Sequence, residues 1–185
     1  MITKLLRTLV GLSIAAIGTL VPTSASATTV WRNFAANEAF CLGNTSGNKP
    51  TKGSDLWVWT CNGTLAQSWD EPTYTPDPSY DWIVNSASVN PNSPSLNLCA
   101  SANSANNGAA VSLDYCGWFT AQGWKAVYSF NDQNNHPCYY WQSDLADAHL
   151  ATRVLGVSGG NVANGTHVIL WDFLSTHADQ YWCAY

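Results

Sequence analysis

Positive charge is scarce in this sequence. Lysine and arginine together number 7, against 12 aspartates and glutamates, and charged residues make up only 10% of the chain. A nucleic-acid-binding surface requires clustered Lys and Arg, and attraction to an anionic membrane surface has the same requirement. The composition therefore argues against nucleic acid and anionic lipid as partners.

Long apolar runs are missing after the first 27 residues. Lys4 and Arg7 precede a largely apolar run over 9–21, and the small residues Ala25-Ser26-Ala27 follow it. This order is typical of a secretory signal peptide, and the run is short for a transmembrane helix. We expect residues 1–27 to be a signal peptide and residues 28–185 to form one secreted domain without a membrane span; a retained N-terminal anchor is the alternative. Loss of the two basic residues changes the net charge from −5 to −7, with five basic against twelve acidic residues.

Motifs for metal binding and catalysis are also lacking. No short Cys-x2-Cys pair of the kind found in structural zinc sites occurs. We interpret Asp144, Asp147 and His149 as surface turn residues. The other histidines lie outside any recognised nucleophile or metal motif: His136, His167 and His177. We therefore predict no metal, no cofactor and no catalytic activity.

Aromatic residues, in contrast, are abundant. Trp, Tyr and Phe make up 12% of the chain, more than the four charged types together. Flat, neutral partners such as sugars suit a surface of this kind, although aromatic cores account for part of the excess. Gly, Asn, Ser, Thr and Pro separate short runs rich in Val, Leu, Trp and Tyr, which predicts an all-β protein of short strands and turns. Only the window Asp144–Ala151 has a helix-like pattern.

A tripeptide motif, Gln-x-Trp, occurs three times. The intervals between successive glutamines are 55 and 58 residues, and each motif closes a segment with the same internal order. A supersecondary unit that recurs at a fixed period is evidence about the whole fold. We therefore predict three repeats, which close at Gln67-Ser68-Trp69, Gln122-Gly123-Trp124 and Gln180-Tyr181-Trp182.

Upstream of each motif lies an alternating segment: 56–59 in unit one, 111–114 in unit two and 168–171 in unit three. Because strand side chains point alternately to opposite faces, each segment has two faces. The face with Leu56 and Val58, Val111 and Leu113, or Val168 and Leu170 is apolar in every unit, so we assign it to the core. The opposite face varies from Trp57 and Trp59 to Ser112 and Asp114 to Ile169 and Trp171, so we expect it to face solvent.

The six cysteines follow the repeat. In units one and two a cysteine pair brackets the alternating segment, while Val154 and Phe173 hold the matching positions in unit three. Two apolar side chains can replace a pair by packing, and the two remaining cysteines then pair with each other. Disulfides are the default for an even number of cysteines in an exported chain. The expected pairs are Cys41–Cys61, Cys99–Cys116 and Cys138–Cys183.

These features resemble the ricin B-type lectin family, in motif, order and number of repeats, over nearly all of residues 28–185. The resemblance implies a β-trefoil, in which three pseudo-symmetric four-stranded units surround a common axis. It also implies that the Gln-x-Trp residues are structural, with Trp69, Trp124 and Trp182 in the shared core.

In this family each unit resembles a shallow sugar pocket with a carboxylate, an aromatic platform and neighbouring polar groups. The carboxylate position is Gly43, Ser101 and Gly156 here, and none is acidic. The platform position is Trp59, Asp114 and Trp171, so two aromatics remain. The residue before the glutamine is Ala66, Ala121 and Asp179. Units one and three therefore keep partial sites, with candidate carbohydrate-binding residues Asn44, Trp57, Trp59 and Asn62 in one and Asn161, Trp171, Asp172 and Asp179 in the other.

Two functions fit this pattern. The first is a secreted, non-catalytic, lectin-like protein whose partner is a glycan or polysaccharide and whose sites differ from the usual galactose-type pocket. The second is a protein-interaction β-trefoil with decayed sugar sites, such as an accessory toxin subunit, an envelope component or an inhibitor that binds another secreted protein. Burial of Trp57 and Trp59 under the Pro-rich excursion Asp70–Asn97 would leave unit one without a platform.

Overall fold

The computed structural model describes residues 28–71, 79–90, 92–117, 119–145 and 151–185. Within them the chain forms twelve strands in three consecutive sets of four and single-turn 3-10 helices, with no α-helix. Unit one contains β1 (Trp31–Asn33), β2 (Phe40–Asn44), β3 (Leu56–Thr60) and β4 (Trp69–Asp70). Unit two contains β5 (Val84–Asn85), β6 (Leu98–Ala102), β7 (Ala109–Tyr115) and β8 (Trp124–Asn131). Unit three contains β9 (Pro137–Ser143), β10 (Arg153–Val157), β11 (Thr166–Asp172) and β12 (Trp182–Ala184).

Six strands close into a ring. Strand β1 pairs with β12, β12 with β9, β9 with β8, and β4 with β5, all antiparallel. Two single bridges complete the ring: Asp81 with Trp124 joins the segment before β5 to β8, and Thr29 with Trp69 joins the segment before β1 to β4. Closure of this kind leaves no free sheet edge along the barrel.

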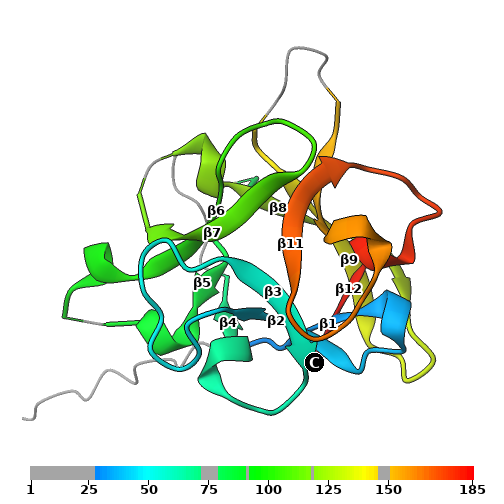
Figure 1. Ribbon diagram of the computed structural model, residues 1–185, viewed down its shortest axis with the longest axis horizontal. Coiled ribbons are helices and arrows are strands. Elements are labelled where there is room, and N and C mark those ends of the chain that lie inside the picture. Colours follow the sequence, from blue (N-terminus) through cyan, green and yellow to red (C-terminus); the bar gives the residue numbers. More distant parts are fainter. Residues whose placement is uncertain (1–27, 72–78, 91, 118, 146–150) are drawn as a thin grey trace, which may run out of the picture.

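The remaining strands form three hairpins, β2–β3, β6–β7 and β10–β11. Their second strands meet one another: β11 pairs with both β3 and β7, and a bridge from Asp55 to Ser112 links unit one to unit two. Figure 1 shows β3, β7 and β11 arranged around the centre of the molecule. The three hairpins therefore cover one end of the barrel with approximate threefold symmetry, and the architecture is an all-β trefoil.

The alternation expected for these strands is confirmed. The apolar residues assigned to the core, Leu56, Val58, Val111, Leu113, Val168 and Leu170, are at most 1% exposed. They join the three closing indoles in one buried cluster. Trp69, Trp124 and Trp182 are each fully buried, and each indole N–H donates to a backbone carbonyl of the first hairpin strand in its own unit: Leu42 (3.0 Å), Ala100 (2.9 Å) and Leu155 (3.2 Å).

The glutamine of each motif has an equally regular role. It ends a 3-10 helix in every unit: η2 (Leu65–Gln67), η5 (Thr120–Gln122) and η7 (Ala178–Gln180). Each buried amide accepts from one backbone N–H and donates to a carbonyl at the end of the preceding strand, so it fixes how the chain leaves the hairpin. The pairs are Asn62 N and Thr60 O, Gly117 N and Tyr115 O, and Leu174 N and Asp172 O. The other 3-10 helices are η1 (Phe34–Ala36), η3 (Ser86–Ser88), η4 (Pro94–Leu96) and η6 (Ser158–Gly160).

Each hairpin loop also braces the next unit. The N–H groups of Gly53, Gly108 and Gly165 donate to Leu113 O (2.7 Å), Leu170 O (2.8 Å) and Val58 O (3.0 Å). All three glycines have φ between 82° and 86°, a left-handed conformation that side chains with a Cβ rarely adopt. The loop of unit three thus supports the second hairpin strand of unit one, and the relation repeats around the axis.

Three disulfides join Cys41 to Cys61, Cys99 to Cys116 and Cys138 to Cys183, the pairs that the repeat predicts. The first two lie within hairpins, while the third joins β9 to β12 in the barrel. In unit three Val154 is fully buried at the position of the missing first cysteine. All six cysteines are therefore used in covalent cross-links.

Two expectations concern residues outside those described. The signal peptide over 1–27 is one, and residues 146–150 of the helix-like window are the other. Among the described residues, no helix has the length and apolar character that crossing a membrane requires.

Candidate functional site

The face of the hairpin strands opposite the core carries two accessible indoles. Trp59 at the end of β3 is 37% exposed, and Trp171 at the equivalent place on β11 is 39% exposed. Each indole lies beside the loop glycine of the preceding unit: a Cβ at Gly165 would be 3.7 Å from Trp59, and a Cβ at Gly108 would be 3.7 Å from Trp171. Trp57 remains partly accessible next to Trp59, so the described part of the excursion 70–97 does not bury this pair.

Unit one has a pocket of about 200 Å³ beneath these aromatics. Trp57 and Trp59 form one wall, with ring centroids 4.8 Å apart and planes inclined by 34°. The other lining residues are polar or small: Asn44, Gly47, Asn48, Asn62, Thr64, Ala66 and Gln67. No charged side chain is among the residues that line this pocket.

The indole of Trp57 occupies the place where a carboxylate would stand. A Cβ on Gly43 would lie 3.5 Å from Trp57 Nε1, so the indole N–H reaches across this glycine. Nothing in the described part of the chain accepts a hydrogen bond from that N–H. Unit one therefore presents a donor at the position where the resemblance implies an acceptor.

The amides of this pocket are oriented by the backbone. Asn44 Oδ1 accepts from Ser46 N (3.0 Å), Asn48 Oδ1 from Ala66 N (3.0 Å), and Asn62 Oδ1 from Thr64 N (3.1 Å). A backbone N–H donates only to oxygen, so these bonds fix which end of each amide is the oxygen. Asn44 Nδ2 in turn donates to Ala66 O (3.3 Å), whereas no described residue accepts from the NH₂ groups of Asn48 and Asn62.

Unit three has a pocket of about 250 Å³ at the equivalent place. Trp171 and Ile169 form its apolar side, and the carboxylate of Asp179 lies opposite. A Cβ on Gly156 would be 3.4 Å from Asp179 Oδ2, so the Asp179 side chain fills the space above this glycine. His177 Nδ1 lies 3.5 Å from Asp179 Oδ1 at the rim. The acceptor missing from β10 is thus supplied by the residue that precedes Gln180.

Two other candidate residues of unit three lie elsewhere. Asp172 forms an ion pair with Arg153, and its Oδ2 accepts from Asn107 Nδ2 (2.6 Å), so the loop of unit two holds this carboxylate. Neither Asp172 nor Asn161 lines the pocket. The structure gathers Trp171 and Asp179 in one site and leaves these two outside it.

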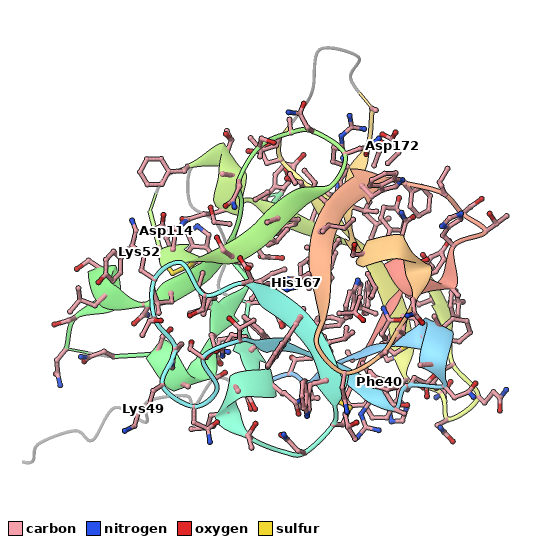
Figure 2. The ribbon with its side chains drawn as sticks, viewed as in Figure 1. Phe40, Lys49, Lys52, Asp114, His167 and Asp172 are labelled. Atoms are coloured by element: carbon pink, nitrogen blue, oxygen red, sulfur yellow. A yellow bond between two sulfur atoms is a disulfide. The ribbon has the colours of Figure 1, made fainter. Side chains whose placement is uncertain are left out.

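Unit two lacks an aromatic platform, because Asp114 stands where the other units have tryptophan. Its carboxylate accepts from Tyr115 N (2.6 Å) and pairs with Lys52 Nζ (2.7 Å) from the loop of unit one. Figure 2 labels Lys52 and Asp114 in this part of the molecule. In the other units the loop residue is an asparagine: Asn164 Oδ1 accepts from Thr60 N (2.7 Å), and Asn107 Oδ1 from Asp172 N (2.7 Å). Lysine has no acceptor, so in unit two the Asp114 carboxylate provides it instead. The residue that replaces the platform is therefore part of the loop contact.

A separate group of titratable side chains lies near the C-terminus. Tyr185 Oη lies 2.7 Å from both Glu38 Oε2 and Asp132 Oδ2, and His136 Nδ1 lies 3.0 Å from the same Asp132 oxygen. Burial alone would raise the pKa of Asp132, but hydrogen bonds from Tyr185, His136 and the backbone hold it well below its usual range. Burial and the two carboxylates raise the pKa of Tyr185.

This group brings Glu38, Asp132 and Cys183 within 4.8 Å of one another. The Cys183 sulfur is bonded to Cys138, so it is not the thiolate that a metal would require. Arg32 also lies over the Tyr185 ring, 3.9 Å from its centroid, and the His136 ring lies 3.7 Å from it with the planes inclined by 30°. The arrangement ties the chain end to the turn at 132–136, and we assign it a structural role.

Sequence reasoning missed several pocket residues. These are Asn48 and Thr64 in unit one, and Gly160 and His177 in unit three. Thr64 and His177 are equivalent, since each lies three residues before the motif glutamine at the N-cap of its 3-10 helix. Their shared spacing to the glutamine is a sequence signal that could have found both residues. The chemistry available in both pockets is stacking on an indole and hydrogen bonding to nearby polar groups, the combination by which proteins hold sugar rings.

No protein-family model matches the sequence, and no curated protein matches it either. Solved structures match the fold at low sequence identity. The designed threefold-symmetric protein ThreeFoil has a TM-score of 0.63 and 14% identity, with 85% of this chain and 96% of that chain covered. The β-trefoil lectin of the Vibrio vulnificus hemolysin/cytolysin, solved with N-acetyl-D-lactosamine bound, has a TM-score of 0.60 and 18% identity, with 87% and 95% covered.

An exo-β-1,3-galactanase from Clostridium thermocellum has a TM-score of 0.68 and 16% identity over 87% of this chain, which spans only 30% of that enzyme. At such identities the matches establish architecture alone. They agree with the threefold arrangement of the hairpins, and the chain has the β-trefoil fold.

Proposed function

We propose that this protein is a secreted, non-catalytic, lectin-like protein that binds glycan through units one and three. The observation that carries the proposal is the pair of accessible indoles, Trp59 and Trp171, at equivalent positions, each beside a polar pocket. Large exposed indoles next to hydrogen-bonding groups are a costly feature for a surface without a partner. Unit two has no platform, so we assign it no sugar.

Three further observations support this proposal. The Gln-x-Trp geometry recurs three times as the resemblance to ricin B-type lectins implies, and solved β-trefoils with the same architecture include lectins. Three disulfides are typical of proteins that fold outside the reducing cytosol. The charge-poor surface favours neutral polyols over ionic partners.

Two weak sites on one rigid domain favour polymeric ligands. Stacking on a single indole with a few hydrogen bonds gives modest affinity, but two sites that bind one polysaccharide chain or surface gain through effective concentration. We therefore expect retention on an immobilised polysaccharide to exceed what either pocket provides alone.

The test is retention on a panel of insoluble polysaccharides and a glycan array, with Trp59→Ala, Trp171→Ala and the double variant. Each single variant should reduce retention, and the double variant should abolish it, because the two pockets are separate. Tyr128→Ala is the matched control, since Tyr128 is 58% exposed on β8 and lines neither pocket. A blank panel with the wild-type protein, or equal retention by the double variant, would refute the proposal.

A protein-binding trefoil is the second candidate. It draws on unit two, where Phe119 is 64% exposed and Tyr115 is 46% exposed beside the lost platform. In that case Phe119→Ala would abolish stoichiometric copurification with one secreted protein, whereas the tryptophan variants would retain it. Copurification that depends on the two tryptophans instead would favour the glycan site.

A further inference from the structure

The unused hydrogen-bonding groups of the unit-one pocket are mainly donors. Each of the three asparagine oxygens already accepts at least one backbone N–H, and Gln67 Oε1 accepts from Asn62 N (2.9 Å). The Trp57 indole N–H and the NH₂ groups of Asn48 and Asn62 belong to lining residues and have no partner among the described residues. Thr64 gives its proton to Asn62 Oδ1 (2.7 Å), so its hydroxyl can still accept, as can the second lone pair of Asn48 Oδ1 and of Gln67 Oε1.

A pocket of this polarity selects its ligand. Sugar hydroxyls both donate and accept, so a site for unsubstituted sugar normally includes acceptors, as Asp179 provides in unit three. A carbonyl oxygen only accepts, and its two lone pairs can take two N–H donors without leaving a proton of its own unpaired. The donor set around Trp57 therefore fits an acyl oxygen better than a hydroxyl.

Charge decides between a neutral and an anionic acyl group. The lining residues include no lysine, arginine or histidine, and the chain is acidic overall. A carboxylate would enter this pocket without a counter-charge, which is costly, whereas a neutral amide carbonyl would not. The exposed Trp59 face beside the pocket is available to a pyranose ring or to the methyl group of an acetamide.

We propose that the unit-one pocket binds an N-acetylated sugar, with the acetamido carbonyl directed at Trp57 Nε1 and at the amide groups of Asn48 and Asn62. This inference rests on the proposed glycan-binding function and gives it a substrate class for one site. Unit three, with Asp179 as acceptor, recognises sugar hydroxyls instead. Unit one then binds an acceptor on the ligand, whereas unit three binds donors on the ligand.

The test compares two neutral trisaccharides with the same β-1,4 backbone and adds an acidic trisaccharide as a third ligand. Tri-N-acetylchitotriose carries acetamido groups where cellotriose carries hydroxyls, and tri-galacturonic acid supplies the carboxylate comparison. Titration into the Trp171→Ala protein, followed by NMR shifts of the Trp57 and Trp59 indole N–H signals, isolates unit one. Tri-N-acetylchitotriose should bind at least about tenfold more tightly than cellotriose, the difference that one or two hydrogen bonds produce.

Substitutions that exchange donor for acceptor test the residues. Asn48→Asp and Asn62→Asp keep an oxygen for Ala66 N and Thr64 N, so the loops stay in place, while each replaces an NH₂ by an oxygen. Each should weaken binding of tri-N-acetylchitotriose about tenfold, and Trp57→Phe should weaken it several-fold. Asn90→Asp is the control: its Oδ1 accepts from Asn92 N (3.0 Å) outside the pocket, and the charge change is the same.

The outcomes separate the inference from the function beneath it. Three results would overturn the N-acetyl assignment and leave glycan binding intact. The first is equal affinity for the two neutral trisaccharides, and the second is tighter binding of tri-galacturonic acid. The third is unchanged or tighter binding of tri-N-acetylchitotriose by Asn48→Asp and Asn62→Asp. Failure of all three trisaccharides together with a blank polysaccharide panel would overturn both. Circular dichroism of every variant must match the wild type before its affinity is interpreted.

Discussion

Gln67 provides a stringent test of the repeat, because its amide makes three hydrogen bonds at the end of the first hairpin. The side chain is 3% exposed; it accepts from Asn62 N (2.9 Å) and donates to Trp59 O (3.3 Å) and Thr60 O (3.1 Å). Gln67→Glu keeps the acceptor and the shape but replaces the donating NH₂ by an oxygen. Two carbonyls then face an oxygen instead of a donor.

The expected cost follows from those contacts. Each buried polar group left unpaired costs about 1–3 kcal/mol, and a buried carboxylate without a cation adds to this. We expect Gln67→Glu to lower the free energy of unfolding by roughly 3–5 kcal/mol at pH 7. The environment raises the folded-state pKa of the new carboxyl above its unfolded value, so its penalty is smallest below the unfolded pKa of about 4.3 and grows as the pH rises.

Urea unfolding, followed by tryptophan fluorescence at pH 7 and pH 4, measures the loss of unfolding free energy and its dependence on pH. Gln133→Glu is the matched control, since Gln133 is exposed in the turn at 132–136 and receives the same charge change. The difference between the two variants should shrink at pH 4, where the protonated carboxyl can donate to one carbonyl again. If Gln67→Glu is no less stable than Gln133→Glu at pH 7, or if the gap is independent of pH, the role assigned to the amide is wrong.

Two further predictions concern the barrel. Hydrogen bonds depress the folded-state pKa of Asp132, so its contribution to stability is present above the unfolded pKa of about 3.9 and is lost as the pH falls below it. Urea midpoints measured between pH 6 and pH 2.5 should therefore fall less steeply with pH in Asp132→Asn than in the wild type. Parallel curves for the two proteins would contradict this. The Cys138–Cys183 bond spans 45 residues, against 20 for Cys41–Cys61, so the double Ser variant of the former should lose about 4 kcal/mol and more than the latter, in unfolding measured without reductant.

The backbone plan of this protein could be predicted from sequence because it rests on periodic information. Alternation places Leu56 and Val58 in the core and Trp59 outside it, and recurrence of Gln-x-Trp aligns the three units. Cysteine positions follow the same register, so the disulfides follow from the alignment. Each of these inferences depends only on the spacing of residues along the chain, which can be read from the sequence.

Which side chains enter the pockets depends on three-dimensional geometry, which the spacing of residues does not specify. Asp179 stands over Gly156 because η7 directs the residue before Gln180 toward β10. Asp172 is adjacent to the platform in sequence, yet Arg153 and Asn107 hold it outside the pocket. Side-chain direction at a strand end depends on which loop packs against it, and that loop comes from another unit.

Pseudo-symmetry and divergence are therefore divided between two layers of the same molecule. The buried glutamines and indoles repeat almost without change, because each makes the same backbone hydrogen bonds and any alteration would leave buried groups unpaired. The outer face of the hairpins makes few such bonds, so Trp57, Ser112 and Ile169 differ at one equivalent position without consequence for the core. A glycine on the first hairpin strand leaves room above it, and in unit one an indole N–H enters this space while in unit three a carboxylate does. In the proposed assignment one scaffold carries a donor-rich pocket and a carboxylate pocket, and a ligand with both acyl and hydroxyl groups would engage both.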